Sequence, residues 1–277
     1  MLAGLGSFIQ QTIVAPPDIT IANASLSNTS FYTGNKDDRA SGLAFNNSGT
    51  IMILSGLENN KLYEYILSTP WDISSASFSN KTFDVTNEVF LNSGIHFKSD
   101  GTLLYIIDSG NRKVYQYNLS TPFDISTTTF ANKTVDVISQ DGNPRDINFN
   151  DTGTKMFLVG AEFSKVWQYN LTTAYDISTA TYANINFDVS SEVTDRIQSI
   201  EFVNSGKRFF ITDSGTDNVF EYDLTTPYDI TTASYNNVSF NVGSEESIVQ
   251  GSAIDRMNKN KMFIIGRSTN RVYMYNL

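Results

Sequence analysis

The chain has 277 residues, a formal net charge of −10 at pH 7 and no cysteine. The acidic balance argues against binding a nucleic-acid backbone or an anionic membrane, because both need clustered Lys and Arg. The missing cysteines exclude disulfide bonds, a thiolate nucleophile and a metal held by thiolates. No apolar run is long enough to insert across a bilayer.

The first segment, residues 1–17, reads MLAGLGSFIQQTIVAPP and lies outside the pattern of the rest of the chain. It is apolar with small residues, and it lacks the basic start of a secretory signal. We expect it to be a docking arm that attaches to a neighbouring subunit. A disordered start and a strand lying across the main domain are the alternatives.

Residues 18–277 form one domain built from a repeat of about 50 residues. An aromatic-x-aromatic-x-Leu phrase occurs five times, at steps of 52, 52, 53 and 53 residues, and its first aromatics are Tyr63, Tyr115, Trp167, Phe220 and Tyr273. An Asp-Ile phrase also occurs five times, at Asp18, Asp72, Asp124, Asp176 and Asp229. The two series are out of phase, as expected for a closed ring whose last unit is completed by the first strand.

The unit at residues 93–137 shows most clearly that each repeat contains four strands, here named a to d. Strand a, Ser93–Lys98, alternates between polar and apolar residues, and strand b, Thr102–Ile107, is apolar throughout. Strand c, Lys113–Leu119, alternates again, and strand d is Thr128–Val137. Units of about 50 residues with four short antiparallel strands are typical of propeller blades.

The sequence therefore predicts an all-β fold, a five-bladed β-propeller of four-stranded antiparallel blades with almost no helix. The a strands start near Gly42, Gly94, Asp146, Ser199 and Ser252. The d strands are expected at Ser25–Tyr32, Ser77–Val85, Thr129–Val137, Thr181–Val189 and Ser234–Val242. The first of them, Ser25–Tyr32, should pair with Arg271–Leu277 and so cover the open edge of the last blade.

One rim of this propeller should be scaffold, because its a–b turns and c–d connections are nearly the same in every unit. The aromatic residue of each c–d connection should pack on a neighbouring strand; these residues are Trp71, Phe123, Tyr175 and Tyr228. The aspartate that follows each of them should accept backbone N–H groups in an Asx-type turn. Calcium binding is disfavoured, since one carboxylate per unit falls short of the six or more oxygens that calcium takes.

The opposite rim carries the d–a and b–c loops, which vary between units, and variable loops on a uniform scaffold are common places for binding. Acid–Arg pairs there could grip sugar hydroxyls, and Phe90 could stack on a pyranose ring. The candidate binding residues are Asp38, Arg39, Phe90, Asp108, Arg112, Asp141, Arg145, Asp195, Arg196, Asp213 and Arg267. The alternative is that they are solvated charges and weak local ion pairs.

Catalytic residues find little support in the sequence. The only histidine, His96, has Ala44, Asn148, Glu201 and Ile254 as its counterparts, so we interpret it as structural or exposed. No GxSxG elbow accompanies it, and metal sites built on histidine lack ligands. A glycosidase-like carboxylate pair stays open, with Asp146, Glu201 and Asp255 as its members. We predict no catalytic residue, no cofactor and no metal.

The units SGIHFKSDGTLLYIIDSGNRKVYQYNLSTPFDIS and RDINFNDTGTKMFLVGAEFSKVWQYNLTTAYDIS resemble a propeller repeat of bacteriophage virion proteins, especially tail and fibre components of marine phages. The same repeat occurs in large bacterial surface proteins, and it is more distantly similar to NHL and YVTN repeats. The resemblance covers residues 18–277. It implies the propeller fold and no fixed catalytic set.

We therefore expect a non-enzymatic structural or adhesive protein of a phage particle. Residues 1–17 would contact other virion proteins, and the variable rim would contact a partner protein or a host-surface glycan. The alternative is a carbohydrate-binding module or adhesin, located outside the cell or on the bacterial surface. A glycosidase- or lactonase-like enzyme is the third possibility.

Overall fold

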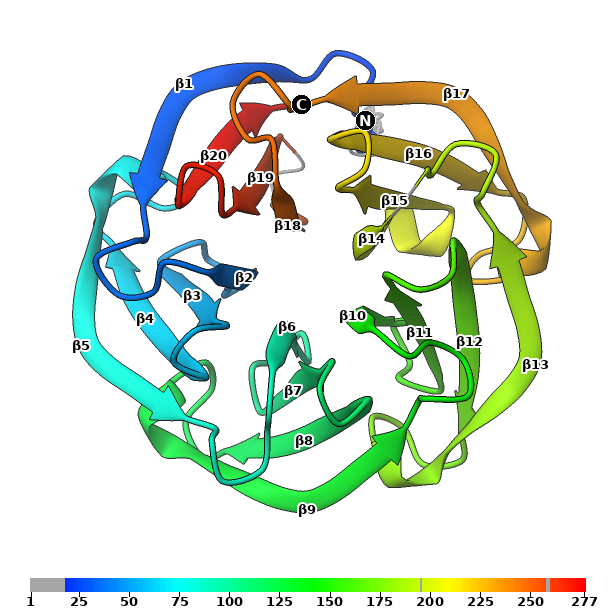
Figure 1. Cartoon of the computed structure of the whole chain (residues 1–277), viewed down its shortest axis with the longest axis horizontal. Coiled ribbons are helices and arrows are strands. Elements are labelled where there is room, and N and C mark those ends of the chain that lie inside the picture. The colour runs from blue at the N-terminus through cyan, green and yellow to red at the C-terminus, as the bar shows by residue number, and fades with distance from the viewer. Residues whose placement is uncertain (1–17, 195, 258–259) are drawn as a thin grey trace, which may run out of the picture.

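The protein is a five-bladed β-propeller (Figure 1). The computed structural model describes residues 18–194, 196–257 and 260–277, so the docking-arm prediction for residues 1–17 lies outside the described part. Five four-stranded antiparallel sheets surround a central axis, and each blade runs from an innermost a strand to an outer d strand. Within the described ranges the only helices are single 3-10 turns, and none is long and apolar enough to cross a membrane.

Each of blades 1 to 4 is built from four consecutive strands. Blade 1 is β2 (Ala40–Phe45), β3 (Ile51–Gly56), β4 (Lys61–Leu67) and β5 (Ala76–Asp84); blade 2 is β6 (Asn92–Phe97), β7 (Leu103–Asp108), β8 (Lys113–Leu119) and β9 (Thr128–Asp136). Blade 3 is β10 (Pro144–Phe149), β11 (Lys155–Gly160), β12 (Lys165–Leu171) and β13 (Ala180–Asp188); blade 4 is β14 (Ile197–Val203), β15 (Arg208–Asp213), β16 (Asn218–Leu224) and β17 (Ala233–Asn241).

The fifth blade joins the two ends of the chain, as predicted. Its inner strands are β18 (Val249–Ile254), β19 (Lys261–Gly266) and β20 (Arg271–Asn276), and its outer strand is β1 (Ser25–Tyr32). The antiparallel pairing of β1 with β20 places Ser25 opposite Asn276 and Tyr32 opposite Arg271. Figure 1 shows the blue strand β1 alongside the red strand β20.

Two predicted boundaries differ from the structure by one residue. The outer strands β5, β9, β13 and β17 each begin and end one residue earlier than expected. In blade 5, Gly251 faces Ile265 just as Asp146 faces Val159, so Gly251 and not Ser252 is the equivalent position. Ala253 and not Ile254 is therefore the counterpart of His96. The fifth unit lacks the Ser-Gly, Asp-Gly or Thr-Gly turn that marks the alignment in the other units.

The uniform connections interlock as the sequence predicts. In blade 1 the ring of Trp71 lies against Gly49 of the a–b turn, and the Trp71 N–H donates to the Gly49 carbonyl at 2.9 Å. Asp72 then caps a 3-10 turn, Ile73–Ser75, by accepting from the Ser74 N–H. The same aspartate cap recurs at Asp124, Asp176 and Asp229. These aspartates are local structural groups.

Candidate functional site

The propeller has two ends that differ in character. We call the end with the a–b turns and c–d connections the turn face, and the end with the d–a and b–c loops the loop face. The predicted binding residues that the structure describes belong to the loop face, and Asp195 lies outside the described residues. Among the others, the arginines near the axis lie close together, whereas several carboxylates are buried in hydrogen bonds within the loops.

The carboxylates of Asp108, Asp141 and Asp213 are buried and bonded to backbone N–H groups. Asp108 accepts from the N–H groups of Phe90 and Leu91 in the d–a loop, and from Gly110 and Asn111 in its own b–c loop. Asp141 and Asp213 make similar bonds. These carboxylates join loops, so they are not displayed toward a ligand.

Every blade contains one such carboxylate, which we call the loop clamp. In blades 1, 3 and 5 the clamp residue lies in the d–a loop, and the last residue of strand b is glycine. In blades 2 and 4 the last residue of strand b is itself the clamp residue. The five clamp pairs are Asp37 with Gly56, Val89 with Asp108, Asp141 with Gly160, Val193 with Asp213, and Glu246 with Gly266. A Cβ on Gly160 would lie 2.3 Å from the Asp141 carboxyl group, so only one partner of a pair can carry the acid.

The other predicted residues are more accessible. Phe90 is 70% exposed, and Arg39 makes a loose ion pair with Glu58 at 3.8 Å. Arg112 donates to the carbonyls of Gly110 and Gly142, and Asp38 is exposed. The remaining predicted arginines, Arg145, Arg196 and Arg267, lie toward the axis.

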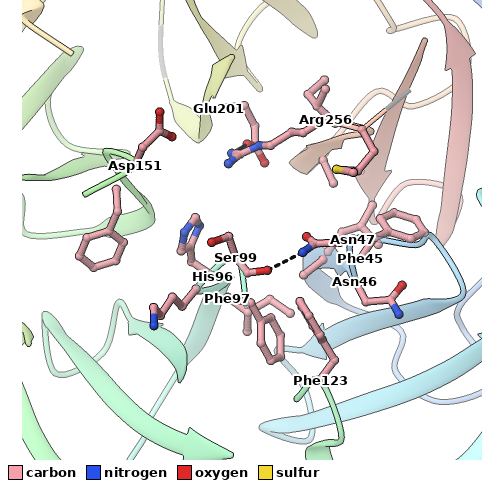
Figure 2. Close-up of a pocket in the computed structure, with 18 of the residues that line it drawn as sticks. Phe45, Asn46, Asn47, His96, Phe97, Ser99, Phe123, Asp151, Glu201 and Arg256 are labelled. Carbon is pink, nitrogen blue, oxygen red and sulfur yellow. Dashed lines mark hydrogen bonds and ion pairs between the residues drawn. The ribbon is translucent and has the colours of Figure 1, made fainter. Parts of the chain in front are cut away.

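The larger cavity opens on the turn face, at the end that sequence reasoning had assigned to scaffold. It has a volume of about 250 Å³ and lies on the propeller axis. Figure 2 shows its mouth, with Asn47, Ser99, Asp151 and Arg256 arriving from a–b turns of different blades. Aromatic side chains form part of its wall; they are Phe45, Trp71, Phe97, Phe123, Phe149 and Tyr175.

An ion pair lies in this axial pocket. Arg256, from the turn after β18, donates to the Glu201 carboxylate on β14, and the two side chains face one another in Figure 2. Glu201 is only 14% exposed, whereas Arg256 is 46% exposed and accessible to a ligand. Asp151 lies at the mouth, where it accepts from the Tyr228 hydroxyl at 2.6 Å. The pocket thus offers donors and acceptors beside apolar ring edges.

Two further titratable groups lie deeper in the channel. Burial, with a further contribution from the Arg256 charge, lowers the pKa of His96 to about 3, so the imidazole is neutral at pH 7. Burial raises the pKa of Asp146 well above its usual range, with Glu201 adding to the effect. Both oxygens of Asp146 accept backbone N–H groups, from Ile147 and Ile200. Asp255, the third acid considered from the sequence, is buried and accepts from the Met257 N–H in its own turn.

This pocket was not predicted from the sequence, because binding was expected in the variable loops. The key residues of the pocket lie within the a strands and one a–b turn. The signal was present in two places. The central a-strand position reads Ala44, His96, Asn148, Glu201 and Ala253, which is diverse for a uniform repeat. The fifth a–b turn carries Arg256 and Met257 where the other units have Asn-Ser, Ser-Asp or Asp-Thr. Among described residues no cluster of three or more His, Asp or Glu side chains could hold a metal ion.

Comparisons with known proteins show the fold alone. No protein-family model matches this chain, and no curated protein matches it in sequence. A protein from Lactobacillus plantarum has a similar structure at 14% identity, with a TM-score of 0.54, over 86% of this chain and 67% of that one. The Cps50 (Swd1) β-propeller domain of Myceliophteria thermophila is similar at 9% identity, with a TM-score of 0.51, over 92% of this chain and 99% of that domain.

Another similar structure belongs to a Bacteroides uniformis protein provisionally named a 6-phosphogluconolactonase. It matches at 10% identity with a TM-score of 0.47, and the match covers 73% of this chain but only 55% of that protein. The names of these structural neighbours are therefore mixed and point to no single activity. The class that fold and comparisons define is the five-bladed β-propeller.

Proposed function

We propose that this protein is a non-enzymatic binding propeller whose axial pocket on the turn face holds one sugar unit of a surface glycan. The observation that carries the proposal is the Glu201–Arg256 pair, whose arginine is accessible, set beside aromatic rings. Ligand sites typically combine apolar and aromatic linings with a few polar groups that fix orientation. Sugars match such a lining, because they present hydroxyls on their edges and C–H groups on their faces.

The size of the pocket limits what it would hold. At about 250 Å³ it is slightly smaller than the roughly 300–1,000 Å³ sites that enclose drug-sized ligands. A single sugar residue, or the end of a longer chain, suits this volume. The repeat resembles that of phage virion proteins, so we place the protein in a phage particle, as an adhesive component that contacts a host-surface glycan. A bacterial surface adhesin would use the same pocket.

The test is a glycan array followed by calorimetric titration of the best-binding glycan. Asp151→Asn and Arg256→Gln should each weaken binding by about tenfold or more, since each removes a charged hydrogen-bond partner. Arg112→Gln removes an exposed arginine from the opposite face and should leave binding unchanged. A glycan that binds the wild type and both pocket variants equally would overturn the assignment of the pocket.

A hydrolase is the second candidate, and the close pair of Asp146 and Glu201 is the observation that favours it. Glycoside cleavage uses two carboxyl groups that flank the scissile bond, one of them with a raised pKa. The bonds from Asp146 to two backbone N–H groups argue against this role, because they hold both of its oxygens. Release of free sugar from the array-selected glycan, abolished by Glu201→Gln, would favour the hydrolase over the binding protein.

A further inference from the structure

The opposite end of the axis carries an unusual concentration of positive charge. Four arginines from four different blades lie around it; we call Arg39, Arg145, Arg196 and Arg267 the axial arginines. Arg39 and Arg196 stand directly before β2 and β14, and Arg267 directly follows β19, so the blade geometry directs all of these positions to the inner edge of the loop face. In a chain with net charge −10, such a grouping is notable.

Arg145 occupies a special backbone position. In every blade one residue near the start of strand a is skipped by the pairing with strand b, which makes a β-bulge. The five bulge residues are Ser41, Ser93, Arg145, Gln198 and Gln250. All five line a narrow cavity of about 20 Å³ on the axis. Arg145 is the only charged side chain among these five. Asp146, whose pKa burial raises well above its usual range, and Glu201, which is paired with Arg256, also line the cavity.

This cavity contains a hydrogen-bond donor without a partner. The Nε of Arg145 is buried and bonds to none of the described residues. Buried polar atoms nearly always have a partner, so this N–H group indicates a missing acceptor. Arg145 also makes no ion pair with a carboxylate in the described part of the chain.

The neighbouring charges fit the same conclusion. Burial and the guanidinium groups of Arg196, Arg267 and Arg39 lower the pKa of Arg145 to about 10, so it stays charged at pH 7 beside like charges. Asp141 offsets part of this repulsion, but as the loop clamp of blade 3 it already accepts from the backbone N–H groups of Asn143 and Phe163. A bound anion would relieve the repulsion that remains.

We propose that the axial mouth on the loop face binds a carboxylate group through Arg145. One carboxylate oxygen would enter the narrow cavity and accept from Nε, and the other would remain among the axial arginines. A planar two-oxygen group matches the fork of a guanidinium, and a cavity of about 20 Å³ has room for one oxygen rather than a whole tetrahedral anion. This site opens at the other end of the axis from the axial pocket, and His96 and Glu201 line both cavities. The carboxylate need not belong to the proposed glycan.

The experiment compares two ligands that differ only by the carboxylate, glucuronate and glucose, in calorimetric titrations at constant ionic strength. We expect saturable binding of glucuronate to the loop face and none of glucose there. Arg145→Gln should weaken glucuronate binding at least about tenfold, because a hydrogen bond to a charged group is lost. Gln198 and Gln250 hold the same bulge position in blades 4 and 5, so glutamine fits the fold.

Arg112→Gln is the matched control, since it removes the same charge from the same face away from the axis. Equal loss of affinity in Arg112→Gln and Arg145→Gln would reveal general charge attraction and overturn the site. Absence of saturable glucuronate binding to the wild type, or undiminished binding to Arg145→Gln, would do the same. Sulfate or phosphate binding more tightly than glucuronate would overturn the choice of a carboxylate.

Discussion

Single residues on the axis carry most of the chemistry that distinguishes this propeller from its own repeat. The position shared by Ala44, His96, Asn148, Glu201 and Ala253 lines the axial pocket in four blades, and only three of the five blades fill it with a polar side chain. Asn148 also donates weakly to Glu201, at 3.4 Å. A small number of substitutions at one repeat position was enough to make a symmetric channel asymmetric.

His96 provides a direct test of how dry this channel is. Its ring centre lies 5.7 Å from that of Phe149 and 6.4 Å from that of Tyr105, and its pKa is lowered to about 3. Because the chain has one histidine, proton NMR should show a single imidazole signal that does not titrate between pH 7 and 5. A midpoint near 6.5 in the folded protein would contradict the burial.

The same group should affect stability in acid. The folded pKa is below the unfolded value of about 6.5, so the unfolded state takes the proton first and stability falls as pH drops from about 6.5 toward 3. At pH 5 the contribution is at most about 2 kcal/mol, and smaller where pocket water reaches the ring. His96→Asn, which copies Asn148, should therefore lose less stability between pH 7 and 5 than the wild type. Asp146, with a raised pKa, acts in the opposite direction in both proteins.

At the scale of elements, the loop clamp shows how the repeat tolerates variation without losing its function. Either the d–a loop or the end of strand b provides the acid, and the other position is then glycine or valine. The two arrangements bond the same two loops to one buried carboxylate. A loop that varies in sequence is thus still fixed in space by a charge-assisted set of backbone bonds.

The clamp predicts a compensating pair of substitutions in blade 3. Gly160→Asp alone should place a second carboxylate against Asp141. Asp141→Val alone should leave buried backbone N–H groups without an acceptor. We expect each to lower the free energy of unfolding by about 2 kcal/mol or more. The double variant recreates the Val89–Asp108 arrangement of blade 2 and should recover to within about 1 kcal/mol of the wild type. Urea unfolding of all four proteins measures this coupling, and simple addition of the two losses would contradict it.

Elements were more predictable from the sequence than sites. Strands appear in the sequence because alternation and apolar runs are local properties, and turns such as Ser99-Asp100-Gly101 mark their ends. The axial pocket depends on side chains about 50 residues apart that meet only when the sheets surround the axis. The burial of Asp108 and Asp141 could likewise not be predicted from the sequence. An acidic residue in a polar loop gives the same sequence pattern whether it faces water or a set of backbone N–H groups.

At the scale of the whole molecule, the out-of-phase repeats correctly predicted that β1 completes the last sheet. The five interblade cores follow from this closure, since each is shared by neighbouring sheets. Phe263 of blade 5, for example, packs against Phe45 of blade 1 at 4.4 Å between ring centres. Opening the ring at any blade would expose such a core.

Deleting residues 1–33 should therefore destabilise the protein far more than the loss of a terminal tail. The deletion leaves β20 as an unpaired edge and removes Ile19 and Ile21, which are buried in the core. We expect a loss of several kcal/mol, or on the order of 10 °C in the melting temperature. Deleting residues 1–17 keeps β1 and serves as the control. A 1–33 deletion that melts within a degree or two of this control would refute the sealing role of β1.

The pairing of β1 with β20 also determines when the ring can close during translation. Tyr32 leaves the ribosome 239 residues before its partner Arg271, and at about 5–20 residues per second the delay is roughly 10–50 s. Blades 1 to 4 can assemble from contiguous chain as they emerge, whereas Ser25–Tyr32 has to wait without a partner strand. The nascent protein is therefore most vulnerable to misassembly and most dependent on chaperones at its first strand, until its last one has been translated.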